Sequence, residues 1–149
     1  MNEGISYEDY LNKYGVLTYS IKGVSMLPLL REGKDLFTVT KKEDERCKVG
    51  DVVLYRRPPN DCVLHRIIKV REHDYVILGD NCVQKEYGIT DEDIIGVMTG
   101  FVRDGKTHSV AELGYRLYTF LMLHTVAGRI FLKKRKGTMK YLVKRVIRR

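Results

Sequence analysis

The spacing of hydrophobic and polar residues changes along the chain and divides it into three parts. The first part is short. Residues 5–14 fit a helix, with Ser6 as the predicted N-cap and Asp9, three residues on, as the acid of a short capping box. Gly15 is predicted to end this helix.

The middle part, from residue 16 to about residue 110, has β-branched and aromatic residues in short runs separated by turns. Runs of this kind predict β-strands. We expect strands over residues 16–21, 35–40, 51–55, 62–70, 75–78 and 94–102. A hairpin turn is predicted at 103–106. Short strands between turns favour a mainly β body, either barrel-like or a folded sheet.

After Ala111 the apolar residues return to helical spacing, which predicts two helices. The first is marked by Leu113, Leu117, Phe120, Leu121 and His124. The second is predicted to start at Thr138, with an apolar stripe of Met139, Leu142, Val143, Val146 and Ile147. The run KKRKG at 133–137 is interpreted as the linker between them. We therefore expect a β domain over 1–112 and a basic helical tail over 113–149.

The positive charge of the chain is confined to this tail. The whole chain has a net charge of +8, but residues 1–112 carry 16 basic and 19 acidic side chains, a net charge of −3. Residues 113–149 contain 11 Lys and Arg and no acidic residue. This distribution argues against a uniformly basic nucleic-acid-binding domain.

Three interpretations of the basic tail remain open. Its helices could pack on the β body with their charges in solvent. The stripe from Met139 to Ile147, flanked by Lys and Arg, also fits a helix lying on an anionic membrane surface. Nucleic-acid binding is the least favoured, because Tyr141 has no series of aromatic neighbours for base stacking.

Cysteine usage and the N-terminus indicate the cellular compartment. The three cysteines have no CxxC spacing, which predicts reduced thiols; they are Cys47, Cys62 and Cys82. The N-terminal residues include early acids and no apolar run, and no stretch reaches the ~20 apolar residues that span a bilayer. We expect a cytoplasmic protein, held at the inner face of the membrane if the tail binds lipid.

Four short segments contain residues that could carry chemistry. Ser25 lies in a Gly/Pro loop at 23–28, a turn at 50–53 enters a strand, His65 lies within a strand, and Asp80 lies in a turn. Each of them alone is explained by structure. Together they supply a serine, a histidine and an acid, which is the inventory for nucleophilic catalysis, because a serine hydroxyl needs a base and the base needs an orienting partner.

The strings and their order resemble the type I signal peptidases and their relatives, the LexA-type self-cleaving repressors. The matching boxes are Gly-x-Ser-Met-x-Pro at 23–28, Gly-Asp-x-Val at 50–53, His-Arg at 65–66, Gly-Asp-Asn at 79–81 and Asp-x-x-Gly-x-x-x-Gly-Phe at 93–101. His-Arg instead of Lys-Arg is similar to the endoplasmic-reticulum subtype, which archaea and some spore-forming bacteria share. The resemblance covers about residues 15–105 and implies a signal peptidase/LexA-like folded β-sheet.

The resemblance also implies an activity: a serine endopeptidase that removes a leader or signal-type segment from a precursor peptide or preprotein. Ser25 would attack the scissile carbonyl, and His65 would act as general base. Asp80 would orient His65 or hold the active-site loop, with Glu86 as the alternative acid. The N–H of Ser25 would stabilise the oxyanion, in a substrate-binding region formed by Gly23, Val24, Met26 and Pro28. No cofactor and no metal are predicted.

Departures from the family pattern leave other functions open. Gly23 stands where bacterial signal peptidases often have a serine that donates to the oxyanion. Further acids after the Gly-Asp-Asn box are absent or replaced by Glu86. We expect no counterpart of the membrane anchor of signal peptidases or of the helix-turn-helix of LexA-type proteins. The alternatives are a peptide-binding module without turnover and an adaptor acting through its basic tail on membranes or nucleic acid.

Overall fold

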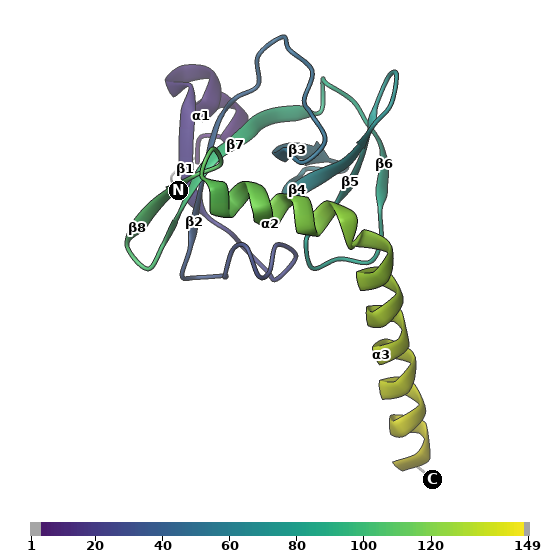
Figure 1. The fold of residues 1–149 in the computed structure, drawn as a ribbon. Coiled ribbons are helices and arrows are strands. Elements are labelled where there is room, and N and C mark those ends of the chain that lie inside the picture. The colour runs from purple at the N-terminus through teal and green to yellow at the C-terminus, as the bar shows by residue number, and fades with distance from the viewer. Residues whose placement is uncertain (1–3, 148–149) are drawn as a thin grey trace.

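The computed structural model describes residues 4–147, which form a mainly β protein with three helices (Figure 1). An antiparallel sheet of eight strands has the order β1-β2-β7-β3-β4-β5-β6, and β8 pairs with β7. The strands are β1 (Val16–Ser20), β2 (Leu36–Lys41), β3 (Val52–Arg57), β4 (Asp61–Val70), β5 (Tyr75–Leu78), β6 (Glu86–Ile89), β7 (Ile94–Arg103) and β8 (Lys106–Ser109). The helices are α1 (Tyr7–Tyr14), α2 (Leu113–His124) and α3 (Val126–Ile147). The predicted fold class is confirmed at this level.

All of the strands that the sequence predicts are present, and two more are added. The predicted turn at 103–106 is confirmed: Asp104 and Gly105 both have positive φ, at 50° and 75°, as a tight hairpin turn requires. This turn leads into β8. The other addition, β6, has only two large apolar residues among its four and therefore lacks an alternating pattern of useful length.

The long strand β7 joins the two halves of the sheet. It pairs with β2 over Gly96–Val102 and with β3 over Ile94–Val97. Two clusters of buried apolar side chains pack on the sheet, and both include residues of β3, β4 and β7. The first includes Met26, Phe37 and Leu54, and the second includes Tyr55 and Ile77. Burying one such large side chain contributes roughly 1.5–3 kcal/mol, so the two clusters fix the strands that carry the candidate site.

Helix α1 begins and ends where the sequence predicts. The Ser6 hydroxyl accepts a hydrogen bond from the Asp9 N–H at 3.0 Å, and Gly15 closes the helix with a left-handed φ of 77°. Leu11 is buried against Gly96 of β7, where an added Cβ would lie 3.1 Å from the Leu11 side chain. The glycine at 96 is therefore explained by close packing of helix on strand.

The C-terminal helices correct one prediction. The first helix lies where the sequence places it, but the second begins at Val126 and runs without a break to Ile147. No linker exists at 133–137, because Lys and Arg are good helix formers and one interior glycine costs only about 1 kcal/mol. Met139 of the predicted stripe is exposed. The side chains of the other stripe residues lie outside the described part; they are Leu142, Val143, Val146 and Ile147.

Helix α2 runs along the surface of the β body, and α3 projects away from it (Figure 1). Tyr115 and Tyr118 on one side of α2 pack against the first core cluster, and Met122 is buried. The first helix of the predicted tail is therefore packed on the body. None of the helices within residues 4–147 has the combination of length and apolar character that crossing a bilayer requires.

Candidate functional site

A cavity of about 410 Å³ brings together Ser25 and His65. The two residues are 40 positions apart in the sequence, in the β1–β2 loop and on β4. Apolar side chains line the cavity beside them, among them Ile21, Phe37 and Leu54. The structure therefore places the predicted nucleophile and the predicted base on one concave, partly apolar surface, which is the usual form of a ligand site.

The loop that carries Ser25 is held by ionic and polar contacts. Gly23 has a left-handed φ of 79°, and its N–H donates to Oε1 of Glu32 at 2.8 Å. At the other end, Arg31 donates from Nε and Nη2 to both oxygens of the fully buried Asp35, at 2.9 and 2.7 Å. These bonds from Arg31 lower the pKa of Asp35 to about 2. Arg103 donates to the carbonyl oxygen of Pro28 at 2.7 Å, so the loop is anchored at several points.

The other loop residues named from the sequence have different surroundings. Met26 is fully buried in the first core cluster, so its side chain anchors the loop from inside. Val24 is exposed, and its carbonyl oxygen accepts a hydrogen bond from Nδ2 of Asn81 at 2.9 Å. Pro28 is exposed and follows a cis peptide bond. Of the side chains named as substrate-binding, Val24 and Pro28 are thus at the surface and Met26 is in the core.

His65 is buried, and an acid lies against one of its ring nitrogens. Nδ1 of His65 is 3.0 Å from Oε1 of Glu86, the first residue of β6. Because a carboxylate only accepts hydrogen bonds, this contact places the proton on Nδ1 and leaves the lone pair on Nε2. Burial lowers the pKa of His65, and the charge of Glu86 opposes that shift. His65 is therefore a neutral base at neutral pH.

Because Gly79 has no side chain, the Ser25 loop and His65 can lie close together around it. A Cβ at this position would lie 2.8 Å from the Ser25 carbonyl oxygen, 2.9 Å from Nε2 of His65 and 2.7 Å from Sγ of Cys82. Nε2 of His65 and the Ser25 backbone thus meet around one point. Within residues 4–147, neither the Ser25 hydroxyl nor Nε2 of His65 has a hydrogen-bond partner. Both groups are available to a bound substrate, and catalytic hydrogen bonds often form only in that complex.

Asp80 binds Arg66 rather than His65. Its two carboxylate oxygens accept from Nε and Nη2 of Arg66, each at 2.8 Å, and Oδ2 also accepts from the Tyr118 hydroxyl at 2.8 Å. No hydrogen bond joins Asp80 to His65 in the described part of the chain. Of the two roles that the sequence left open for Asp80, this geometry corresponds to holding the loop. The acid beside His65 is Glu86, which sequence reasoning named only as the alternative.

Arg66 explains why several of the sequence boxes lie together. Neighbouring residues on a strand point to opposite faces, so His65 faces Glu86 while Arg66 faces α2. Nη1 of Arg66 donates to the Gly50 carbonyl oxygen at 2.8 Å and to Thr119 of α2 at 3.0 Å. Arg66 and Asp80 are both buried. This one guanidinium therefore ties together two turns and the first C-terminal helix.

Asn81 connects the Gly-Asp-Asn turn to the loop of Ser25 and to α3. Its N–H donates to the Ser25 carbonyl oxygen at 2.7 Å. From α3, Nη1 of Arg129 donates to the Asp80 carbonyl oxygen at 2.6 Å, and Lys133 donates to the backbone and side-chain oxygens of Asn81. Sequence reasoning missed both cations. Their only signal is a spacing of four residues on one helix face, which is common in basic helices.

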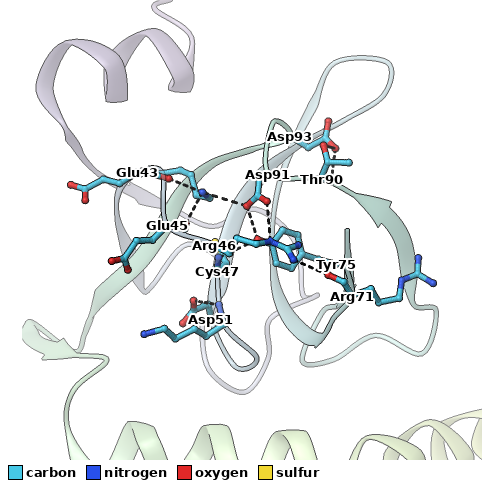
Figure 2. Close-up of polar contacts among 12 residues, drawn as sticks. Glu43, Glu45, Arg46, Cys47, Asp51, Arg71, Tyr75, Thr90, Asp91 and Asp93 are labelled. Atoms are coloured by element: carbon cyan, nitrogen blue, oxygen red, sulfur yellow. Dashed lines mark hydrogen bonds and ion pairs between the residues drawn. The ribbon is translucent and has the colours of Figure 1, made fainter. Parts of the chain in front are cut away.

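A second polar network lies around Asp91 and supports a different loop (Figure 2). Asp91 accepts hydrogen bonds from the Tyr75 hydroxyl at 2.5 Å and from Nε of Arg46 at 3.1 Å. The Tyr75 hydroxyl in turn accepts from the Cys47 N–H at 3.1 Å. Nearby, Asp51 of the Gly-Asp-x-Val box accepts from the Lys48 N–H at 2.7 Å. These contacts fix the turn whose Gly50 carbonyl binds Arg66, so their role is structural.

The cysteines are unpaired, as the sequence predicts. Cys82 lines the cavity and lies beside Nε2 of His65. Burial raises the pKa of Cys82, so its thiol is protonated at neutral pH, and the thiolate is the nucleophilic form. Ser25 is therefore the better candidate nucleophile. In residues 4–147, no group of three or more His, Cys, Asp or Glu side chains could hold a metal ion.

A scan against protein-family models finds no match to this sequence, and a search of curated proteins finds no significant match either.

Proposed function

We propose that the protein is a serine endopeptidase of the signal-peptidase type, with a signal peptidase/LexA-like folded sheet. The observation that carries the proposal is the surroundings of His65. One ring nitrogen is bound by Glu86 at 3.0 Å, and the other lies beside the loop of Ser25 in a shared cavity. An imidazole oriented by an acid and lying beside a serine loop is an arrangement from which the serine hydroxyl can be activated.

In the proposed reaction, Oγ of Ser25 attacks the carbonyl carbon of the scissile peptide bond, and Nε2 of His65 accepts the hydroxyl proton. The tetrahedral intermediate collapses to an acyl-serine ester as His65 returns that proton to the leaving amine. Water then attacks the ester, and His65 takes its proton. The carboxylic acid product leaves and Ser25 recovers its proton. Base catalysis of this kind contributes roughly 10²–10⁴-fold.

Two backbone features support the remaining roles. The N–H of Ser25 donates to no other group within residues 4–147, so it can donate to the oxyanion that forms next to Oγ. One such donor contributes about 10²–10³-fold to kcat. The Glu86 carboxylate lies against Nδ1, where its charge stabilises the imidazolium that forms when His65 takes the proton. Asp80 acts through Arg66 and Asn81, which hold the turn against the loop of Ser25.

The substrate that fits this site is a peptide with a leader or signal-type segment. Ile21, Phe37 and Leu54 give the cavity an apolar wall that can accept a small apolar side chain next to the scissile bond. The three unpaired thiols fit a reducing compartment, so we place the reaction in the cytoplasm.

The test is to incubate the protein with a peptide library from a bacterial proteome and to identify new N-termini by mass spectrometry. The proposal predicts a set of new termini with wild type and none with Ser25→Ala or His65→Ala. The control is Cys82→Ala, which removes the cavity thiol beside Nε2 of His65 and should retain cleavage. Termini that persist in Ser25→Ala would overturn the proposal.

A peptide-binding module without turnover is the second candidate. One observation favours it: within the described residues, no hydrogen bond joins Ser25 to His65. This candidate predicts that the wild type retains library peptides without cleaving them, and that Ser25→Ala retains the same peptides equally well. The same mass spectrometry, applied to retained peptides, separates the two functions.

A further inference from the structure

One side of helix α2 packs on the β body, and the opposite side is uncovered. Tyr118 and Thr119 on the inner side bind Asp80 and Arg66. The outer side carries four large apolar residues that are between 51% and 81% exposed; they are Leu113, Leu117, Phe120 and Leu121. Residues spaced three and four apart share one face of a helix, so these four form one outer apolar face.

The turns of α3 that follow α2 also expose large apolar residues, together with basic ones. Phe131 and Leu132 are 59% and 58% exposed. Lys134, Arg135 and Lys136 are also exposed. The segment 113–149 contains eleven basic residues and no acidic one. The uncovered surface therefore combines large apolar side chains with positive charge alone.

We propose that the outer apolar face of α2, with the adjoining basic turns of α3, binds the surface of an anionic lipid bilayer. A lipid surface is complementary to both kinds of residue. Its apolar layer accepts Phe120 and Leu121, and its negative headgroups attract the lysines and arginines. A second copy of the chain would place eleven further positive charges against the first, which is repulsive. A nucleic acid would supply negative charge but no apolar layer.

Two contacts link this surface to the cavity. Arg129 and Lys133 are turned toward the body, where they bind the backbone of Asp80 and Asn81. Asn81 holds the loop of Ser25. Because these two cations are occupied by the body, the exposed cations of α3 are the ones available to lipid. A bilayer bound to α2 would thus hold the cavity near the membrane surface.

The test is flotation of the full chain with two kinds of vesicle, pure phosphatidylcholine and an equimolar mixture with phosphatidylglycerol. We expect flotation with the mixed vesicles at low salt, and at least about tenfold less with phosphatidylcholine alone or at high salt. Phe120→Ser combined with Leu121→Ser should lower binding to the mixed vesicles at least about tenfold, because both side chains lose their contact with the acyl layer.

The matched control is Val49→Ser, which removes an exposed apolar side chain outside the helices and should bind as wild type does. Circular dichroism melting checks that each variant folds. Equal flotation of the double variant and wild type would overturn the proposal, as would absence of wild-type binding to the mixed vesicles. If light scattering shows that the wild type is a dimer and the double variant is a monomer, a second copy covers the face instead.

The result is independent of the peptidase assay. Ser25→Ala should float as wild type does, because Ser25 lines the cavity and none of the four residues of the outer apolar face does. Lipid binding without cleavage would refute only the proposed peptidase, and cleavage without lipid binding would refute only the membrane surface.

Discussion

Oε1 of Glu86 lies 3.0 Å from Nδ1 of His65, and the two residues come from strands separated by β5 in the sheet. The contact gives the ring a fixed orientation and a fixed tautomer. It also separates the two acids near the site into different roles, because Asp80 is committed to Arg66. Substitution of Glu86 should therefore lower activity, whereas substitution of Asp80 should lower stability.

Glu86→Gln should lower kcat/KM by at least about 100-fold while the melting temperature changes little. The amide can donate to Nδ1 and so favours the wrong tautomer of His65, as similar changes do in serine peptidases. Steady-state kinetics and thermal melting on the same samples measure both effects. Unchanged kcat/KM would remove Glu86 from the mechanism.

Asp80→Ala should instead act on stability. It leaves Arg66 charged and buried without its partner, which costs roughly 3–5 kcal/mol in the free energy of unfolding. Urea unfolding measures this loss. The matched control is Glu8→Ala, which breaks the exposed pair with Arg56 and should cost about 1 kcal/mol at most. Equal losses in the two variants would contradict the structural role of Asp80.

The pH dependence of kcat/KM should report the surroundings of His65. Burial lowers the pKa of His65 below its ordinary value of 6.5, so activity should rise with pH and reach half its maximum below pH 6.5. Arg57 also lowers the pKa of His65, and Glu86 raises it. Arg57→Gln should therefore move the acid limb to higher pH, and Glu86→Gln should move its residual activity to lower pH.

Arg56→Gln is the control for this profile, because Arg56 pairs with Glu8 and has no contact with His65. Its acid limb should coincide with that of wild type. If Arg57→Gln and Glu86→Gln shifted the limb in the same direction, His65 would not be the group that titrates.

Much of the fold can be predicted from local sequence, and the residues of the site show where prediction stops. Runs of β-branched residues predict β4 and β7 because the preference for strand is local. The partner of His65 is not local. Glu86 reaches it because β6 pairs with β5 in a register that sets Glu86 opposite Ile77, and no spacing along the chain encodes that register.

The helix boundary at the tail fails for a different reason. Gly137 within a run of cations suggests a linker, but the charges lie on a helix surface in solvent and do not interrupt it. The roles of Arg129 and Lys133 could not be predicted, because they depend on where α3 leaves the body.

Gly79→Ala should abolish most activity with a smaller effect on stability. The new Cβ would lie within 3.0 Å of the Ser25 carbonyl oxygen, Nε2 of His65 and Sγ of Cys82, so the loop and the ring must move apart. A displacement of this kind can cost about 100-fold in rate. Gly128→Ala on α3 is the control. Its Cβ meets no atom within 4 Å, and it should retain activity and gain up to about 1 kcal/mol of stability.

The ion pair between Arg31 and the buried Asp35 in the Ser25 loop predicts a loss of stability in acid. The pKa of Asp35 is lowered to about 2 by Arg31, whereas an unfolded aspartate titrates near 3.8. The pair therefore stabilises the folded protein above about pH 4, and this contribution is lost as the pH falls towards 2. The urea concentration at which half of the protein is unfolded should fall steeply for wild type as the pH is lowered across this range. It should fall less for Asp35→Asn. Parallel curves would contradict the assignment.

The most direct test of the peptidase is to trap its acyl intermediate. A peptide that the wild type cleaves is mixed with the protein, the reaction is stopped in acid within the first turnover, and the protein is digested and analysed by mass spectrometry. The account predicts that the acyl group of the N-terminal product is attached to Ser25 and is absent from Ser25→Ala and His65→Ala. An acyl group on Cys82, or cleavage that proceeds in Ser25→Ala, would contradict it.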